Sequence, residues 1–171
     1  MQTTDGQVVI ISMPTTLLQA SARPDGNTFQ VATRLARELN AVHLDLLNYR
    51  VYPFRYDQCY PSDDGFLHLV RHALLPYDRI VFATPVYWYT MSGGMKTFFD
   101  RLSDLLVSEK EVGRQLRGKT MSVLSVSNGD DLPEHFTEPF RLTAAYLGMT
   151  FGESWHGWVD SGQPRLVQWD A

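Results

Sequence analysis

The sequence predicts an α/β fold: a three-layer sandwich on a five-stranded parallel sheet with strand order 2-1-3-4-5. Short β-rich runs alternate four times with longer helical runs, and the apolar run at residues 80–83 is continuous. Such alternation implies right-handed crossovers with helices on both faces of the sheet. A continuous apolar run is typical of a central parallel strand covered on both faces. The length of 171 residues, 44% of them hydrophobic, suits one domain spanning residues 1–171.

Each element is predicted by its own pattern. The first helix begins after Asn27, a good N-cap, and carries apolar residues at helical spacing over residues 28–39. Residues 48–65 contain two prolines and show no period, so we expect a long loop, which is often functional. Strands are expected at residues 15–20, 41–47, 78–84, 120–126 and 149–155, and further helices at residues 66–75, 93–106 and 134–147.

Residues 1–12 leave alternatives open. Residues 8–11 are apolar and could form a strand of their own, or residues 1–12 are a leader and the natural chain starts at Met13. A secretory signal is disfavoured, because the first twelve residues contain no Lys or Arg. Cleavage after Ala22 would also delete the first predicted strand.

Composition excludes several classes of function. The net charge of -4 and the pI of about 5.7 argue against a nucleic-acid partner, which calls for a basic surface. No stretch is apolar enough for a transmembrane helix, which needs about 20 such residues. The single cysteine, Cys59, excludes an internal disulfide and suits the reducing cytoplasm, where we expect the protein.

The predicted strand order locates the ligand site. Open α/β sheets bind ligands beyond the carboxyl ends of their strands, where the strand order switches. Here that point lies between the first loop (residues 21–27) and the second loop (residues 85–92). The first loop leads into a helix start, which attracts anions, and it adds Ser21, Arg23, Asn27 and Thr28 as donors. An ordinary capped turn is the alternative, since Pro-Asp-Gly-Asn is strong turn chemistry.

The second loop carries three adjacent aromatic residues, Tyr87, Trp88 and Tyr89, after Pro85 and Val86. Three neighbouring rings cannot all enter one core, so some must face a ligand, a partner or solvent. An aromatic face stacks well on a planar ring. The alternative is a loop that covers the core or forms a dimer interface.

Both loops resemble the motifs of the NADPH-dependent FMN reductase and NAD(P)H quinone reductase family, within the flavodoxin-like superfamily. The phosphate loop of that family, Gly-Ser-x-Arg-x-x-Gly-Asn-Thr, is matched by residues 20–28, with Ala20 in place of the first Gly. The Ser/Thr-Pro-Val-Tyr-Trp segment is matched by residues 84–88, and the Lys and Asp-Arg pair that follow by Lys96, Asp100 and Arg101. The resemblance extends over residues 15–155. Arg23 favours the reductases over true flavodoxins, whose phosphate loop lacks arginine.

This resemblance implies a cytoplasmic FMN-dependent oxidoreductase that takes electrons from NADPH or NADH. The acceptor would be a small molecule such as a quinone or free flavin, and the enzyme would be a homodimer. The first loop would hold the FMN phosphate. The isoalloxazine would be lined by the second loop and, less firmly, by a third loop (residues 127–129), through Pro85, Val86, Tyr87, Trp88, Tyr89, Ser127, Asn128 and Gly129. Tyr52, Phe54, Tyr56 and Tyr60 look exposed and support a dimer weakly.

Two other functions stay open: a flavodoxin-type electron carrier, and a non-catalytic interaction module whose flavin site is empty. We name no catalytic residue, although Tyr87, Tyr89, His135 and His156 are candidate proton donors. We expect no metal site, because His68 and His72 share a helix face without a third ligand. Asp100 and Arg101 are expected to form a structural ion pair or a helix–loop contact. Asp63, Asp64, Asp130 and Asp131 are expected to be solvated loop carboxylates, with the alternative that Asp130 and Asp131 face the edge of the flavin.

Overall fold

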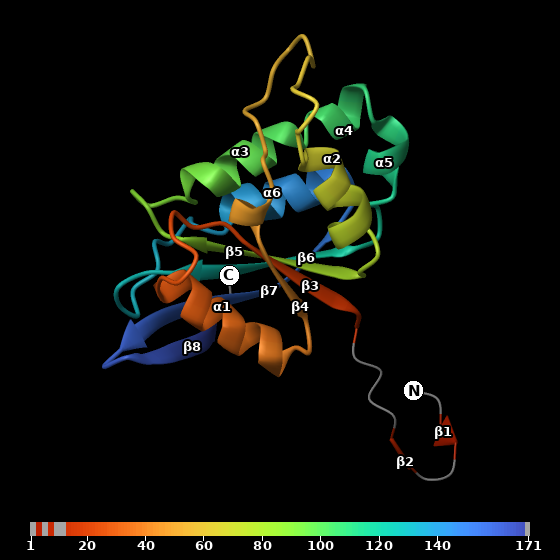
Figure 1. Cartoon of the computed structure of the whole chain (residues 1–171). Helices are drawn as coiled ribbons and strands as arrows, with labels where there is room; N and C mark the ends of the chain where they lie inside the picture. The colour runs from red at the N-terminus through yellow and green to blue at the C-terminus, as the bar shows by residue number, and fades with distance from the viewer. Residues whose placement is uncertain (1–2, 5–6, 9–12, 170–171) are drawn as a thin grey trace.

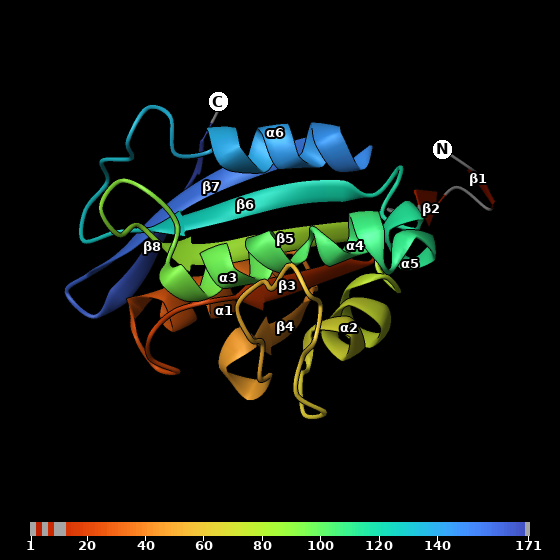
Figure 2. The same ribbon diagram turned by 90° about the horizontal axis from the view of Figure 1, so that it is seen from above.

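The main sheet has six strands in the order β4-β3-β5-β6-β7-β8 (Figures 1 and 2). It belongs to a computed structural model that describes residues 3–4, 7–8 and 13–169. Neighbouring strands are parallel from β4 to β7, and β8 is antiparallel to β7. The parallel part confirms the predicted order 2-1-3-4-5. The strands are β3 (Thr15–Gln19), β4 (Val42–Asp45), β5 (Arg79–Pro85), β6 (Thr120–Val126), β7 (Thr150–Asp160) and β8 (Gln163–Trp169).

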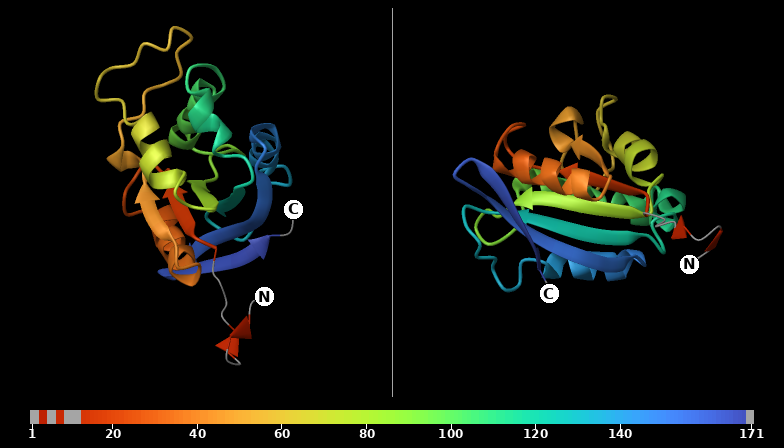
Figure 3. Two further views of the ribbon diagram at one scale, coloured as in Figure 1. Left: turned by 90° about the vertical axis from the view of Figure 1, so that its right-hand side faces the viewer. Right: turned by 90° about the horizontal axis from the view of Figure 1, so that it is seen from below.

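The two faces of the sheet carry different helices (Figures 1 and 3). The helix α1 (Asn27–Glu38) packs on one face, where Val31 and Leu35 join Leu17 and Val81 in one apolar cluster. The larger cluster on the other face is covered by α2 (Phe66–Leu69) with the π-helical turn η2 (Val70–Leu74), α3 (Gly93–Arg101), α4 (Asp104–Val107), α5 (Lys110–Arg114) and α6 (Glu138–Leu147). Apolar residues are buried on both faces of β5, as its continuous apolar run predicts. They are also buried on both faces of β6, although Ser122 and Ser125 interrupt its apolar residues.

Several predicted boundaries differ from the observed ones. The helix expected at residues 93–106 ends at Arg101, and α4 follows as a separate turn because Leu102 bonds back to Phe99 in a tighter i→i+3 pattern. The helix expected from residue 134 begins at Glu138, with Pro139 in its first turn, where proline is favoured. Gly26 rather than Asn27 is the N-cap of α1. The sequence pattern missed α5 and the short 3₁₀ turn η1 (Leu46–Asn48).

The five-strand prediction misses β8, which lies in the tail after the last expected strand. The strand β7 continues to Asp160, and the chain then reverses at Ser161 and Gly162, whose φ angles are 50° and 76°. This two-residue turn with positive φ at both positions is the favoured hairpin geometry. The Ser-Gly pair between two runs containing Trp158 and Trp169 was the available sequence signal.

The strand expected at residues 8–11 falls mostly outside the described residues. Within them, β1 (Thr3–Thr4) and β2 (Gln7–Val8) form an antiparallel pair. In the part of the chain that the structure describes, no helix combines the length and the apolar character needed to span a membrane.

The long loop at residues 48–65 projects from the body (Figure 3) and is held to it by Arg101. The Arg101 side chain is 1% exposed and donates two hydrogen bonds to Asp64, at 2.7 and 2.9 Å. It also bonds to Asp104 at 2.7 Å and lies 3.5 Å from the Tyr60 ring centroid. The expected helix–loop contact of Arg101 is therefore confirmed. The expectation of a solvated Asp64 is wrong, because its side chain is 10% exposed and faces Arg101.

We expect Asp64→Asn to lower the free energy of unfolding by about 3–5 kcal/mol, because breaking a buried pair leaves Arg101 under-compensated. Burial alone would raise the pKa of Asp64, but the hydrogen bonds from Arg101 lower it overall. The stabilisation is therefore present at neutral pH and is lost as pH falls through the depressed pKa. Urea unfolding at two pH values measures both effects. Lys96→Ala, which breaks an exposed pair on α3, is the control and should change the free energy of unfolding by less than about 1 kcal/mol. Equal losses of stability in the two variants would contradict a stabilising role of the buried pair between Asp64 and Arg101.

Candidate functional site

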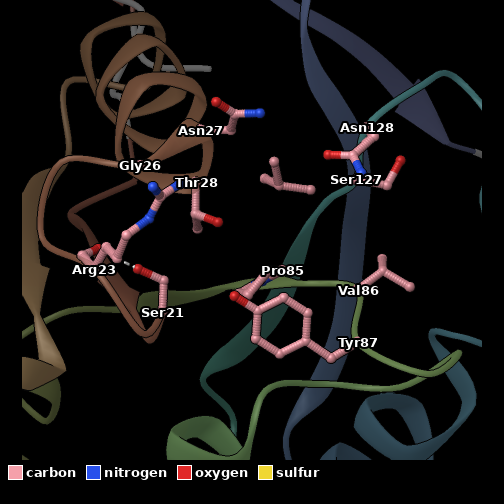
Figure 4. A pocket seen from close by; sticks show the side chains of 11 residues that line it. Ser21, Arg23, Gly26, Asn27, Thr28, Pro85, Val86, Tyr87, Ser127 and Asn128 are labelled. Carbon is pink, nitrogen blue, oxygen red and sulfur yellow. Dashed lines mark hydrogen bonds between the residues drawn. The ribbon is translucent and has the colours of Figure 1, made fainter.

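A cavity of about 260 Å³ lies beyond the carboxyl ends of β3, β5 and β6, at the predicted switch in strand order. Figure 4 shows the first loop on one side, the second loop below it and the third loop opposite. The structure thus brings three segments that are far apart in sequence around one space. The lining residues are Ser21, Arg23, Gly26, Asn27, Thr28, Pro85, Val86, Tyr87, Val126, Ser127 and Asn128.

The first-loop side of the cavity is suited to an anion. The helix α1 starts here, and no side chain caps its free N–H groups. These groups attract negative charge, as does the helix dipole. The Ser21 hydroxyl donates to the Arg23 carbonyl at 2.6 Å, which closes the loop. Arg23 forms no ion pair with other described residues, so its guanidinium is free to meet an anion.

Because Gly26 has no side chain, there is room beside it for the Arg23 side chain. A Cβ atom at this position would lie 3.3 Å from Nη2 of Arg23, closer than most such contacts. The glycine therefore lets the guanidinium fold back over the start of α1 (Figure 4).

The second loop makes a tight turn. Tyr87 and Thr90 exchange backbone hydrogen bonds at 2.9 and 3.1 Å, and the two residues between them have positive φ, 48° at Trp88 and 66° at Tyr89. This is the pattern of a type I′ turn, which usually holds Asn and Gly because bulky side chains are strained there. The turn presents Trp88 and Tyr89 to solvent, 91% and 76% exposed.

Trp88 and Tyr89 do not line the first cavity. They line an adjoining hollow of about 460 Å³ with Asp131, Leu132 and Pro133, and Val86 lines both spaces. Gly129 lines neither space but accepts a 2.7 Å bond from Ser127 through its carbonyl. Of the twelve predicted cofactor residues, the structure therefore gathers nine around one cavity and two in the space beside it.

Two buried hydroxyl groups that sequence reasoning did not select hold the first and second loops together. Ser92 donates to the Ala20 carbonyl at 2.7 Å and caps α3 by accepting from the Met95 N–H at 3.2 Å. Thr84 accepts from the Ser92 N–H at 2.9 Å. The signal for Ser92 was its position before an apolar helical run, which is typical of an N-cap.

Of the candidate proton donors, His156 is fully buried under the third loop. Burial lowers its pKa, so the imidazole is neutral at pH 7. His135 is 85% exposed and lines neither space. Tyr87 lines the cavity with 46% of its surface exposed. In the part of the chain that the structure describes, no three His, Cys, Asp or Glu side chains gather as a metal site.

Comparison with known proteins agrees with this geometry. The sequence model of the NADPH-dependent FMN reductase family matches residues 13–161. The chain belongs to this family. Membership confirms an oxidoreductase that contains FMN and depends on NAD(P)H, on a flavodoxin-like fold.

Individual relatives agree with this family and this fold. The chain is 28% identical over 150 residues, 81% of each protein, to YwqN of Bacillus subtilis, which bears the name of an NAD(P)H-dependent FMN-containing oxidoreductase. The Trp repressor binding protein of Bacillus subtilis superimposes with a TM-score of 0.66 at 25% identity, over 86% of this chain and 89% of that one. The general stress protein 14 of Treponema denticola, solved in complex with FMN, shares the fold with a TM-score of 0.57 at 15% identity over 86% and 87% of the two chains.

The strain in the second loop is testable by replacing Trp88 and Tyr89 with the residues that type I′ turns favour. We expect Trp88→Asn with Tyr89→Gly to raise the free energy of unfolding by about 1–2 kcal/mol, because the positive φ angles become unstrained. Urea unfolding measures the change. The control is Tyr56→Ala, which removes a side chain that is 96% exposed and is expected to leave stability unchanged. A loss of stability in the double variant would mean that the two aromatic rings stabilise the fold more than the turn strains it.

Proposed function

We propose that this chain holds FMN in the cavity between the first, second and third loops and passes electrons from NADPH or NADH to a small acceptor, a quinone or free flavin. The observation that carries the proposal is the meeting of an uncapped helix start and Arg23 with the Pro85–Tyr87 backbone around one space. The acceptor class rests on the family alone.

The first loop would hold the phosphate. The amides at the start of α1, the Thr28 hydroxyl and the Arg23 guanidinium supply the donors that a dianion needs. Thr28 is 4% exposed, so its hydroxyl is fixed rather than mobile. The Ser21 hydroxyl faces the same space but donates to the Arg23 carbonyl, so it would have to turn on binding in order to donate to the phosphate.

The second and third loops would seat the ring system. Pro85, Val86 and Tyr87 form one wall and Ser127 with Asn128 the other, and the space continues past Val86 to Trp88 and Tyr89. FMN, when bound, supplies the hydride chemistry, and the protein supplies position and electrostatics. Asn128 would stabilise negative charge that develops at the ring edge, because the N–H groups of Ser127 and Gly129 already bond within the protein.

We also infer a cytoplasmic homodimer. Trp88, Tyr146 and Tyr56 are 91%, 77% and 96% exposed, and large exposed aromatic residues favour a protein interface. Tyr52, Phe54 and Tyr60 are only partly exposed, so Tyr56 alone fits the exposed aromatic group expected in the long loop. The free, exposed Cys59 suits a reducing compartment. Light scattering of the purified protein decides whether the mass is twice 19.5 kDa.

The proposed reaction predicts that the purified protein incubated with FMN turns yellow and is bleached by NADPH without oxygen. Adding a quinone should then restore the flavin absorbance, and a visible spectrum follows each step. A yellow protein that NADPH does not bleach would instead indicate an electron carrier. A protein that stays colourless would indicate an interaction module without a cofactor.

The phosphate assignment predicts a selective effect of Arg23→Ala. We expect the FMN dissociation constant to rise about tenfold or more, since a hydrogen bond to a charged group contributes roughly 1.5–3 kcal/mol. The affinity for riboflavin, which lacks the phosphate, should hardly change. Flavin fluorescence quenching measures both. Arg37→Ala removes an equal charge at the far end of α1 and should leave both affinities unchanged; an equal loss for riboflavin and FMN would rule out a phosphate contact.

A further inference from the structure

His156 lies at the centre of β7 with its side chain 0% exposed, directly against the third loop. Its Nε2 atom is 2.9 Å from the Gly129 carbonyl oxygen and 3.3 Å from the Ser127 hydroxyl. Its Nδ1 atom is 2.8 Å from the Ser125 hydroxyl on β6. The Trp158 ring stacks against the imidazole, and the Trp169 ring meets it edge-on. Every polar atom of this buried ring therefore has a partner.

These partners determine the tautomer of His156. A carbonyl oxygen only accepts, so the proton of the neutral ring is on Nε2 and is donated to Gly129. Nδ1 then accepts from the Ser125 hydroxyl, whose oxygen lies closer to this nitrogen, at 2.8 Å, than to the alternative acceptor, the Trp155 carbonyl, at 3.2 Å. Burial keeps the ring neutral by lowering its pKa, against the opposing effects of the Gly129 carbonyl and of Asp130 and Asp131, the charged groups that face it.

The contact falls on the part of the third loop that packing does not fix. A Cβ atom added to Gly129 would meet nothing within 4 Å, so no neighbouring side chain confines the backbone there. The loop is instead closed by hydrogen bonds. The Ser127 hydroxyl donates to the Gly129 carbonyl and accepts from the Gly129 N–H at 3.2 Å, and His156 donates to the same carbonyl. The Ser127 N–H connects the start of the loop to the Gly157 carbonyl of β7 at 3.1 Å, and His156 connects its other end, Gly129, to the same strand.

We propose that His156 is a positioning residue that holds the backbone of residues 127–129 in the conformation that receives FMN. This inference rests on the proposed function, because it assumes that the third loop meets the flavin. His156 itself does not line the cavity and acts only through Gly129 and Ser127.

The choice of substitution separates hydrogen bonding from packing. His156→Gln keeps an N–H of similar reach but fills less space, whereas His156→Leu fills the space without a donor. We expect Leu to raise the FMN dissociation constant about tenfold or more, since the Gly129 carbonyl keeps only the Ser127 hydroxyl as a donor and loses its bond to the sheet, and Gln to restore most of the affinity. Fluorescence quenching gives the constants, and thermal unfolding shows that each variant is folded.

His43 offers a matched control. It is a partly buried histidine of the same sheet whose pKa, like that of His156, is lowered by burial, and it bonds to Gln19 rather than to a cavity loop. His43→Leu and His43→Gln should leave FMN affinity within about twofold of the unaltered protein. Ser125→Ala is a milder variant that removes only the partner of Nδ1, and it should weaken FMN binding less than His156→Leu.

Amide hydrogen exchange without FMN supplies a second readout. The Gly129 amide should exchange faster in His156→Leu than in His156→Gln or the unaltered protein. Equal exchange in the two variants, or tighter FMN binding by Leu than by Gln, would overturn the positioning role. If the unaltered protein fails to bind FMN, the proposed function falls together with the FMN part of this inference. The exchange rates then still show whether His156 holds the loop.

Discussion

The hydroxyl group of Ser92 joins the two halves of the site. It bonds at once to the Ala20 carbonyl at the end of β3 and to the Met95 N–H at the start of α3, while its own N–H bonds to Thr84 at the end of β5. All of these groups are buried, so none can exchange its partner for water without a large penalty. The strand that leads to the first loop and the loop that follows β5 are therefore fixed side by side. The cavity depends on this junction, because its first-loop side and its second-loop side come from these two segments.

The second loop is strained, and other parts of the described structure supply the stability that keeps it folded. Trp88 and Tyr89 adopt positive φ and lie mostly in solvent, so the turn is strained and its rings gain little from burial. The apolar clusters on both faces of the sheet, and the buried Arg101 that holds the long loop, more than offset this strain. A turn that holds two aromatic rings in an unfavourable conformation is better explained by binding than by folding.

Sequence reasoning reached the sheet and the site, but only where local patterns carry the information. A continuous apolar run identified β5, and topology alone placed the first and second loops at one edge. The strand β8 was missed because apolar and polar residues do not alternate clearly along it, although the Ser161–Gly162 turn before it was a signal for a hairpin. The burial of Asp64 could not be foreseen, because its partner Arg101 is 37 residues away and only the fold brings them together. The same holds for His156, which the sequence offered only as one of four candidate proton donors. Its contacts with residues 127–129 depend on the pairing of β6 with β7, which the sequence does not show.

Because of that pairing, two neighbouring residues of β7, His156 and Gly157, contact opposite sides of the cavity. Successive side chains of a strand point to opposite faces, so His156 faces the third loop while Gly157 faces α1. A Cβ atom at Gly157 would lie 2.3 Å from Val31, one turn after the start of α1, so the glycine is what lets the phosphate-side helix sit this close to the sheet. The carbonyl of the same glycine accepts from the Ser127 N–H at 3.1 Å. One dipeptide of β7 therefore contacts both α1 and the third loop, and it helps to set the distance between these two sides of the cavity.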